Sequence, residues 1–415
     1  MSLNILMGDC RESMRTLDAR SVQCCVTSPP YWALRDYGVQ PTLWEAMEFV
    51  PMAGLPPVQI PAMECCLGLE DDPLAFVGHM VLVFREVWRV LRDDGVLWMN
   101  FGDSAAPSGS LKPKDIMGMP WRVALALQAD GWTLRQDNIW NKPNPMPESA
   151  KDRCTKAHEY IFLLSKSARY YWDHEAMREP VSGTAHPRGR GVNPKAKWKT
   201  PDGWDTSTGD GGHGSIHRKG REKGKRQVKQ NESFSDAVKG LVTTRNKRSV
   251  WTVNPQPYPE AHFATFPEAL VLPCILAGTS AKGCCPECGA PWERVVVKGE
   301  VDKEHQRACG GDENGEYHGK ATKDYGKARA EDPSAVKARI LAGMRERKTV
   351  GWEPTCDCGE HDPIPCTVLD PFGGSGTTGR VALEEGRSVV LCELNPEYKP
   401  LIQRRCMVTP KFQFC

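Results

Sequence analysis

The 415-residue sequence contains no uninterrupted apolar run of the ~18 residues that a membrane-spanning helix needs. Its N-terminus also lacks the charged segment followed by an apolar segment that marks a secretory leader. The formal net charge is only +2, so local clusters of charge, rather than the total, must carry any electrostatic function. We therefore expect a soluble, cytoplasmic protein that is not exported and has no membrane partner.

Disulfide bonds are the next feature that the sequence gives little reason to expect, although it contains 17 cysteines. Several of them lie in apolar runs typical of a protein core, including Cys24, Cys25 and Cys392. A chain of this length does not need disulfide staples to fold. It also exceeds one typical domain, so we expect one large domain with insertions, or two to three units, in a reducing compartment.

Segments typical of strands alternate with segments typical of helices in both flanks of the chain. Apolar residues recur at three-and-four spacing over 73–91, which predicts an amphipathic helix ended by Asp93-Asp94-Gly95. The stretch 96–101 is nearly all apolar, as expected of a strand covered on both faces. The alternation predicts an α/β fold with a doubly wound, mostly parallel sheet. The other expected strands are 4–7, 22–26, 133–140, 160–164, 366–369 and 388–392, and the other expected helices are 11–17, 121–129, 268–277 and 378–385.

Two stretches interrupt this alternation. Residues 33–72 contain many prolines and little periodicity, which favours a loop or lid. Residues 183–248 are rich in Gly, Lys, Arg and Ser, with the most basic run at 217–226 and with Trp198 and Trp204 among the charges. This composition favours contact with phosphates and bases, and a solvated linker is the alternative.

Two short motifs follow predicted strands. The first motif, Thr-Ser-Pro-Pro-Tyr-Trp at residues 27–32, follows the expected strand 22–26. The second motif, Asp-Pro-Phe-Gly-Gly-Ser-Gly-Thr-Thr at residues 370–378, follows the expected strand 366–369. Ligands of open α/β sheets bind where the carboxyl ends of the strands meet. Glycines let the main chain approach a ligand closely, and Glu393, at the end of the next strand, can accept two hydrogen bonds from a ribose.

Together these motifs resemble the catalytic and S-adenosylmethionine-binding motifs of the β-class DNA amino-methyltransferases, in which the catalytic motif comes first. Residues 392–398 resemble the acidic strand end of the family, and 262–267 resemble its helix-start motif, for which a simple helix N-cap is the alternative. The resemblance covers about residues 1–172 and 250–405, and implies a Rossmann-like methyltransferase sheet with S-adenosylmethionine as cofactor. The cofactor-binding residues would be Asp370, Pro371, Phe372, Gly374, Gly376, Thr377, Thr378, Glu393, His262, Phe266 and Pro267.

The first motif suits chemistry on the exocyclic amine of a base, a poor nucleophile because its lone pair is delocalised into the ring. Ser28 and the carbonyl of Pro29, directed by Pro30, can draw the amine toward tetrahedral geometry and align it. Tyr31 can stack on a base rotated out of the duplex. The catalytic candidates are thus Ser28, Pro29, Pro30 and Tyr31, with Asp9 and Trp32 near the target base. For Asp9, capping the helix at 11–17 is the alternative.

The target base is harder to predict from the sequence. Thr-Ser-Pro-Pro-Tyr is associated with cytosine N4 enzymes, whereas adenine enzymes more often have Asp or Asn before the prolines. The wider pattern, with the loop 142–147 and the stretch 158–160, resembles prophage-borne solitary β-class methyltransferases, many of which are regarded as adenine-specific. We expect a site-specific methyltransferase that acts on adenine N6 after base flipping, with cytosine N4 as the alternative. An RNA or non-nucleic amide substrate, or a non-catalytic zinc-bearing DNA-binding regulator, are further alternatives.

The expected partner is double-stranded DNA, which would associate the protein with the nucleoid. Whether the protein forms a homodimer and whether it has a cognate restriction nuclease are questions that the sequence does not answer. The DNA-binding candidates in the basic run are Arg218, Lys219, Arg221, Lys223, Lys225 and Arg226. The expected segments are 1–172 as the catalytic half, 173–249 as the basic target-recognition insertion, 250–280 as the cofactor-closing helix region, 281–362 as a cysteine-rich insertion and 363–415 as the cofactor-binding half.

The cysteine-rich insertion has the spacing of a metal site. Cys285-Pro-Glu-Cys288 is a zinc knuckle by spacing, and Cys356-Asp-Cys358 supplies a second pair. Four thiolates would bind a structural zinc and tie together the ends of the charged insert at 299–350. Competing ligands close in sequence are Cys284, His361 and Cys366. Unliganded thiols are the alternative, and a deaminase-type catalytic zinc is not expected because no His-x-Glu pair lies nearby.

Overall fold

The computed structural model describes residues 1–106, 112, 114–180, 244–256, 266–298 and 347–409. The chain forms two compact units, of which the first comprises Met1–Arg178, Asn246–Val295 and Gly351–Cys415. Of the second unit the structure describes only the ends of four strands. These strands are β10 (Arg178–Pro180), β11 (Thr244–Asn246), β13 (Trp292–Lys298) and β14 (Arg347–Pro354). The candidates Arg218, Lys219, Arg221, Lys223, Lys225, Arg226 and His262 lie outside the described residues.

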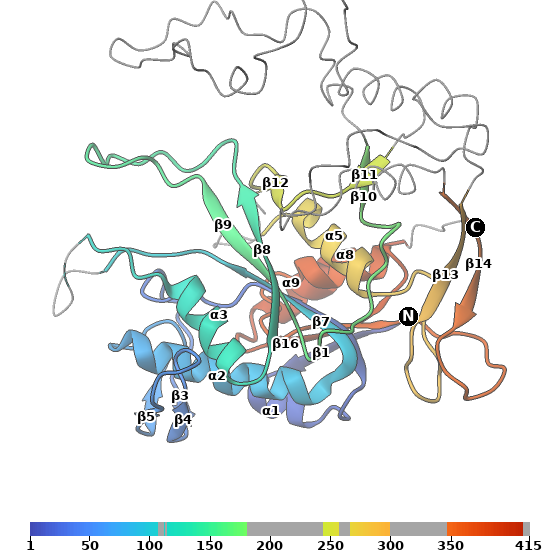
Figure 1. Cartoon of the computed structure of the whole chain (residues 1–415). Coiled ribbons are helices and arrows are strands. Elements are labelled where there is room, and N and C mark those ends of the chain that lie inside the picture. The colour runs from blue at the N-terminus through green and yellow to red at the C-terminus, as the bar shows by residue number, and fades with distance from the viewer. Residues whose placement is uncertain (107–111, 113, 181–243, 257–265, 299–346, 410–415) are drawn as a thin grey trace, which may run out of the picture. The chain divides into compact units, whose positions relative to one another are not determined.

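A mixed β-sheet forms the centre of the first unit (Figure 1). It has eight strands in the order β1-β16-β15-β2-β7-β9-β8-β12. All neighbouring strands run parallel except β9, which is antiparallel to both β7 and β8. The mostly parallel sheet expected from the sequence is therefore confirmed. The strands are β1 (Leu3–Met7), β2 (Val22–Thr27), β7 (Leu91–Phe101), β8 (Thr133–Asn141), β9 (His158–Ser165), β12 (Val250–Thr252), β15 (Thr367–Asp370) and β16 (Ser388–Glu393).

The strand order brings the two ends of the chain together. β15 and β16, from the C-terminal end of the chain, lie between β1 and β2, which are its first two strands. Met7 of β1 pairs with Glu393 of β16, and Cys25 of β2 pairs with Leu369 of β15. Because these strands are parallel, the loops after β2, β15 and β16 leave the same edge of the sheet.

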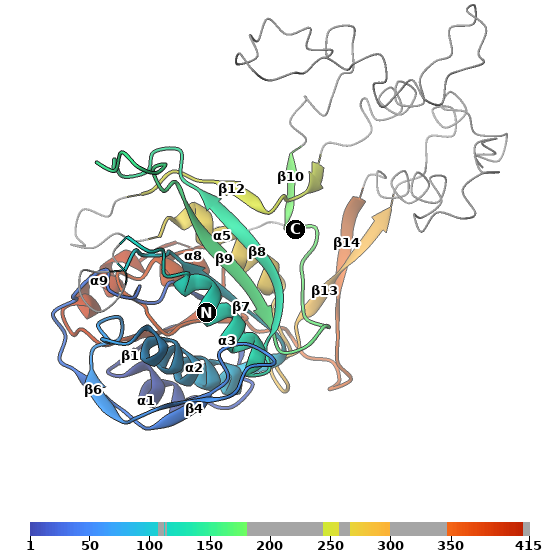
Figure 2. The same cartoon turned by 60° about the vertical axis from the view of Figure 1, so that its left-hand side comes forward.

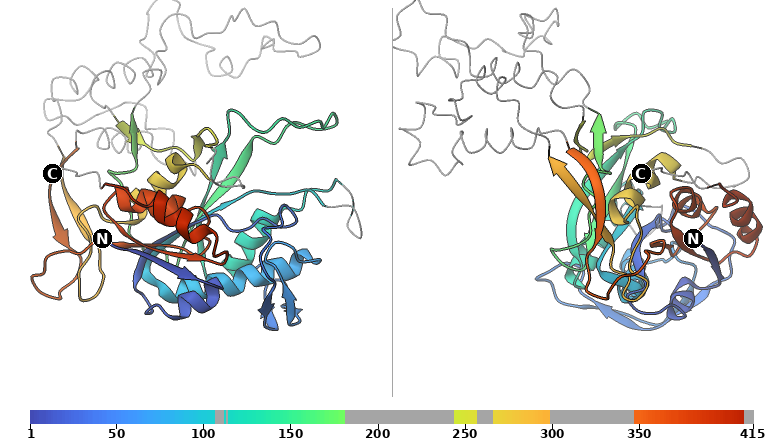
Figure 3. Two further views of the ribbon diagram at one scale, coloured as in Figure 1. Left: turned by 180° about the vertical axis from the view of Figure 1, so that it is seen from behind. Right: turned by 90° about the vertical axis from the view of Figure 1, so that its right-hand side faces the viewer.

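Helices cover both faces of the sheet, as Figures 2 and 3 show. Along β7, Leu97 and Met99 belong to the core under one helical layer, and Val96 and Trp98 belong to the core under the other. This double burial explains the nearly continuous apolar sequence of the strand. The first layer contains α1 (Cys10–Arg15), α2 (Pro73–Val90) and α3 (Met119–Ala129), and the second contains α5 (Glu268–Gly278), α8 (Thr377–Glu384) and α9 (Tyr398–Arg405).

None of the helices in the described residues is long and apolar enough to span a membrane. The longest of these helices, α2, ends at Val90. The sequence had suggested that it ends at Asp93-Asp94-Gly95, and this prediction was wrong. These three residues are part of β7, whose pairing with β2 shifts register between Val22 and Cys24. A Cβ at Gly95 would lie 2.8 Å from the carbonyl oxygen of Gln23. The glycine therefore permits close approach of two strands and does not end a helix.

The segment 33–72 is not the irregular loop that its prolines suggested. It contains two antiparallel strand pairs, β3 (Thr42–Trp44) with β6 (Met63–Cys65), and β4 (Met47–Phe49) with β5 (Val58–Ile60). Each strand has three residues, too few to show a period in the sequence. The pairs pack on α2, where a Cβ at Gly78 would lie 2.9 Å from the sulfur of Met47. Trp44 also stacks on the His79 ring at 4.2 Å between centroids.

Candidate active site

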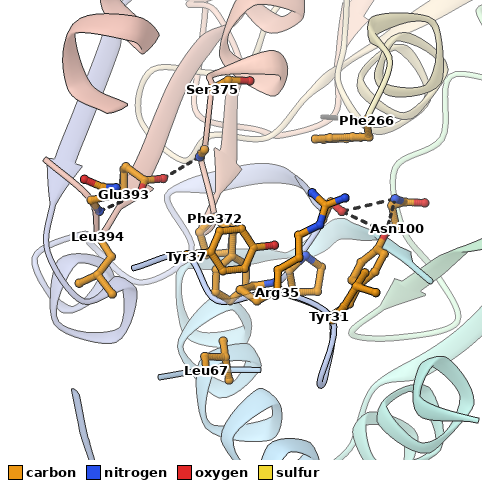
Figure 4. Close-up of a pocket in the computed structure, with 18 of the residues that line it drawn as sticks. Tyr31, Arg35, Tyr37, Leu67, Asn100, Phe266, Phe372, Ser375, Glu393 and Leu394 are labelled. Carbon is orange, nitrogen blue, oxygen red and sulfur yellow. Dashed lines mark hydrogen bonds between the residues drawn. The ribbon is translucent and has the colours of Figure 1, made fainter. Parts of the chain in front are cut away.

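A cavity of about 600 Å³ opens at the carboxyl edge of the sheet (Figure 4). Its volume is typical of sites for small molecules and cofactors. Both motifs recognised in the sequence contribute to its wall, so loops from opposite ends of the chain share one cavity. The lining includes Ser28, Pro29, Pro30 and Tyr31 from the loop after β2, and Pro371, Phe372, Gly374, Thr377 and Glu393 from the loops after β15 and β16.

Glu393 lies at one end of this cavity, and Tyr31 and Asn100 lie at the other (Figure 4). The Glu393 carboxylate accepts a hydrogen bond from the Gly374 amide on Oε2 at 2.7 Å and from the Asn395 amide on Oε1 at 2.8 Å. Burial raises the pKa of Glu393, and the backbone hydrogen bonds oppose that rise. Each oxygen keeps lone-pair capacity for a further donor, so the carboxylate can still accept bonds from a diol.

Three of the predicted cofactor residues hold the loops instead of lining the cavity. Asp370 is 1% exposed. Its Oδ1 accepts from Thr27 Oγ1 at 2.7 Å and from the Phe372 amide at 3.0 Å, and its Oδ2 accepts from Thr378 Oγ1 at 2.7 Å. Gly376 caps α8 with a φ of 83°, which favours glycine. Asp370, Thr378 and Gly376 therefore join the glycine-rich loop 371–376 to β2 and to α8.

Burial also gives Asp370 an unusual acidity. It raises the pKa of the carboxyl from 3.8 to about 7, although the hydrogen bonds from Thr27, Thr378 and Phe372 act in the opposite direction. Desolvation disfavours the charged form of a carboxyl wherever bonds to the ionised form do not fully replace water. The glycine-rich loop 371–376 is thus attached to a group that changes charge near neutral pH.

At the other end of the cavity, Tyr31 and Glu159 form the centre of a polar network. The Tyr31 hydroxyl donates to Glu159 Oε2 at 2.8 Å. Asn100 Nδ2 lies 2.9 Å from that hydroxyl, 3.1 Å from Glu159 Oε2 and 3.4 Å from Ser28 Oγ. Lys142 pairs with Glu159 Oε1. Burial raises the pKa of Tyr31 well above its ordinary value, with a further contribution from the Glu159 charge, so the phenol is neutral.

The Tyr31 ring has little freedom to move. It packs on Phe101 at 5.2 Å between ring centroids. A Cβ at Gly102 would come within 2.6 Å of the Tyr31 ring, so a glycine is required where β7 ends. The side chain is thus fixed at both its ring and its hydroxyl, which pre-organises one aromatic face of the cavity.

The remaining candidates near the target base differ in their placement. Asp9 lines the cavity, and it also caps α1 by accepting from the Arg11 amide at 2.8 Å and pairs with the Arg11 guanidinium. The helix-cap alternative is therefore confirmed for Asp9. Trp32 is 2% exposed, donates to the Glu70 carbonyl at 2.9 Å and does not line the cavity. Phe266 lines the cavity, whereas Pro267 is the residue before α5.

Sequence reasoning missed several residues that line this cavity. Arg35 and Tyr37 come from the segment 33–72, where no motif marked them. Asn100 carried a signal that could have been used, because it is the one amide in the apolar stretch 96–101 and is 3% exposed. A buried polar side chain at the carboxyl end of a central strand needs hydrogen-bond partners, and the Asn100 Nδ2 group finds them in the site.

The cysteine cluster brings together the four expected thiols. One sulfur from each of Cys285, Cys288, Cys356 and Cys358 lies within 4.8 Å of the other three. Backbone N–H groups of the knuckle, Cys288 first, lower the pKa of Cys285 to about 7. Within the described residues the competing candidates do not join this group, and those are Cys284, His361 and Cys366. Four sulfur donors at this spacing fit tetrahedral metal coordination.

Comparison with known proteins identifies relatives across most of the chain. The family model for N6/N4 methyltransferases, described as DNA methylase, matches residues 22–285 and 366–404. The Type II methyltransferase M.SmaI of Serratia marcescens is 34% identical over 346 residues, covering 78% of this chain and 90% of its own. The Type II methyltransferase M.Cfr9I of Citrobacter freundii is 31% identical over 422 residues, covering 96% and 85%.

Solved structures resemble this chain more distantly. The PvuII DNA methyltransferase, described as cytosine-N4-specific, shares 14% identity, with coverage of 99% of this chain and 88% of its own and a TM-score of 0.49. A DNA modification methylase of Thermus thermophilus, solved with S-adenosylmethionine, shares 18% identity, with coverage of 97% and 92% and a TM-score of 0.43.

Proposed function

This chain belongs to the N6/N4 DNA methylase family and is an S-adenosylmethionine-dependent DNA amino-methyltransferase, and we propose that methyl transfer takes place in the cavity between Glu393 and Tyr31. The observation that carries this proposal is the single cavity lined by both motifs. A sulfonium methyl and an exocyclic amine have to meet in line, and proximity and alignment of this kind can supply several kcal/mol of a reaction barrier. A cavity closed at each end by one of the two motifs can provide that alignment.

The residues at the Glu393 end fit a nucleoside cofactor. Glu393 would accept hydrogen bonds from the ribose hydroxyls, because each of its oxygens accepts one backbone bond and has capacity for another. Gly374 would let the main chain approach the cofactor, and Phe372 and Phe266 would contact its apolar parts. S-adenosylmethionine, when bound, supplies a methyl group on a positively charged sulfur.

The residues at the Tyr31 end would bind the target base. Ser28 and the Pro29 carbonyl would accept the two amine hydrogens, which draws the nitrogen toward tetrahedral geometry and frees its lone pair. Pro30 fixes the direction of that carbonyl. Tyr31 would stack on the base after its rotation out of the duplex, a contact worth about 1–3 kcal/mol.

Two bases are candidates for the methylated amine. The likeness to prophage-borne solitary methyltransferases favours adenine N6. The relatives in the comparison are named Type II methyltransferases, which favours a restriction–modification role and gives that likeness no added support. Ser28, the residue that would touch the amine, favours cytosine N4 as the second candidate, because Asp or Asn is more often found at this position of adenine enzymes.

One experiment separates these candidates. The full chain is expressed in a host without DNA modification, and the host DNA is digested to nucleosides for mass spectrometry and mapped by single-molecule sequencing. N6-methyldeoxyadenosine or N4-methyldeoxycytidine at one sequence motif identifies both base and site. Tyr31→Ala serves as the matched control, because it removes the stacking ring and leaves Glu393 in place. A host DNA without either base, with methylated RNA instead, would contradict the proposal.

We also propose roles for the two insertions. The basic segment 173–249 would read the DNA site, because its charge matches phosphates and its tryptophans match bases. The four clustered cysteines would hold a structural zinc that ties together the ends of the insertion 281–362. Such a zinc would contribute to folding and would take no part in methyl transfer.

A further inference from the structure

A chain of hydrogen bonds leads from Ser28 into the wall of the cavity. Ser28 Oγ lies 3.4 Å from the Tyr31 hydroxyl, and that hydroxyl donates to Glu159 Oε2 at 2.8 Å. The first distance is longer than an ordinary hydroxyl hydrogen bond, and catalytic hydrogen bonds commonly shorten only when substrate is bound. Asn100 Nδ2 lies within 3.4 Å of all three oxygens and holds them together.

The proposed reaction needs an acceptor for a proton. The amine carries a positive charge once it has taken the methyl group, and it becomes neutral only by losing a hydrogen as a proton. An aspartate at the position of Ser28 could take that proton itself. A serine hydroxyl can accept it only by passing on its own, so Ser28 requires a base behind it.

Three carboxylates line the described part of the cavity, and only one is connected to Ser28. Glu393 lies at the opposite end and accepts hydrogen bonds from the amides of Gly374 and Asn395. Asp9 is committed to its helix cap and to the Arg11 guanidinium. Glu159 is joined to Ser28 through a single hydroxyl, that of Tyr31.

We propose that Glu159 is the final proton acceptor of the reaction, reached through Ser28 and Tyr31. The amine nitrogen forms its bond to the methyl carbon while the carbon–sulfur bond breaks and leaves its electron pair on sulfur. A proton then passes from the nitrogen to Ser28 Oγ, the Ser28 proton to the Tyr31 oxygen, and the Tyr31 proton to Glu159 Oε2. The products are a neutral methylated amine and a neutral carboxylic acid. The inference rests on the proposed function.

The surroundings of this chain suit the transfer. Lys142 pairs with Glu159 Oε1, which places a positive charge beside the proposed acceptor. A protonated exocyclic amine of this kind is a strong acid, because losing the proton restores delocalisation of the lone pair, so a carboxylate is a suitable acceptor for its proton. The Glu159 side chain is 14% exposed, which gives the proton a route to solvent afterwards.

Matched substitutions distinguish this relay from a structural anchor for Tyr31. Glu159→Gln keeps the size of the side chain and an acceptor for the Tyr31 hydroxyl, but it cannot take the proton. We expect the single-turnover rate to fall about 10²–10⁴-fold. Cofactor affinity by calorimetry and base extrusion, read from 2-aminopurine fluorescence in the mapped site, should stay at wild-type values. Glu148→Gln, which alters a carboxylate outside the cavity, is the control.

A second variant tests the middle of the relay. Tyr31→Phe keeps the ring for stacking and loses only the hydroxyl, with Tyr170→Phe at a surface tyrosine as control. It should lower the rate as Glu159→Gln does, and the double variant should lose little more, because both changes break one path. In Glu159→Ala, added formate should restore part of the rate by replacing the missing carboxylate.

The outcomes separate this inference from the proposed function. Wild-type single-turnover rates in Glu159→Gln, or fully additive losses in the double variant, would overturn the relay while the enzyme remains a methyltransferase. Failure of formate to restore any rate in Glu159→Ala would also count against a proton-accepting role. A wild-type chain that forms no methylated base would overturn the proposed function and the relay with it.

Discussion

Replacing Asp370 by asparagine tests whether the buried Asp370 carboxyl, which anchors the glycine-rich loop 371–376, lowers the free energy of unfolding at neutral pH. The amide has the shape of the carboxyl and can satisfy the same neighbours. Its oxygen can accept from Thr27 Oγ1 and the Phe372 amide, as Oδ1 does now. Its NH₂ group can donate to Thr378 Oγ1, whose own hydrogen can go to the Val26 carbonyl, 3.2 Å away.

The expected gain follows from the pKa of Asp370. The native carboxyl binds its proton with a pKa of about 7 and the ordinary value is 3.8, so the native state holds a proton over a pH range in which the unfolded chain has lost it. Stability therefore falls as pH rises through this range. Between pH 5 and pH 8.5 the wild type should lose about 3 kcal/mol relative to Asp370→Asn, at about 1.4 kcal/mol per tenfold change in proton affinity.

Urea denaturation followed by tryptophan fluorescence at several pH values measures this difference. The stability gap between Asp370→Asn and wild type should widen with pH up to about pH 7 and level off above it, where the native carboxyl has also lost its proton. This change with pH is independent of any fixed effect of the amide on packing. Asp137→Asn, which makes the same substitution at an exposed position on β8, is the matched control. A gap for Asp370→Asn that stays constant from pH 5 to pH 8.5 would refute the reasoning.

Three further predictions concern the cofactor, the metal and the DNA. Glu393→Gln should raise the Kd for S-adenosylmethionine, measured by calorimetry, about 100-fold, because hydrogen bonds to a charged group are worth about 1.5–3 kcal/mol each. Glu397→Gln, at an exposed position, should leave the Kd unchanged, and a wild-type Kd in Glu393→Gln would exclude Glu393 from the ribose site. Cys358→Ser should abolish bound zinc in elemental analysis and lower the Tm, unlike Cys154→Ser; zinc-free wild type would exclude the metal. Charge reversal across 217–226 should weaken DNA binding and flatten its salt dependence by about 0.9 per lost phosphate contact; an unchanged slope would make the run a linker.

The sequence predicted the sheet and the meeting of its two motifs because the information is local. Apolar runs specify buried strands, and a glycine-rich or proline-rich loop directly after such a run has to lie at the carboxyl edge. Ser28 and Tyr31 were predicted as site residues, but Glu159 and Asn100 were not, because their roles depend on distance in the fold. Glu159 follows no recognisable signal for proton transfer, and it contacts Tyr31 only because β9 lies next to β7 in the sheet.

Motif position also misled where burial decides the role. Asp370 opens a loop that resembles a cofactor motif, which suggests contact with a ligand, yet the side chain points into the core and bonds to Thr27 and Thr378. Gly95 looks in sequence like the end of a helix, yet it lies in β7 where that strand packs closely against β2. In both cases the neighbour that decides the role comes from another element, so no local pattern contains it.

The order β1-β16-β15-β2 has a consequence for synthesis. During translation β1 emerges first, and β16, its neighbour in the sheet, is made more than 380 residues later. The gap between β1 and β2 stays empty until both C-terminal strands arrive, and the glycine loop arrives with them. A ribosome-bound intermediate therefore has the proposed amine-binding loop, residues 27–32, before the residues that would bind the methyl donor have been made. The chain can therefore become an active methyltransferase only after β16 has been made.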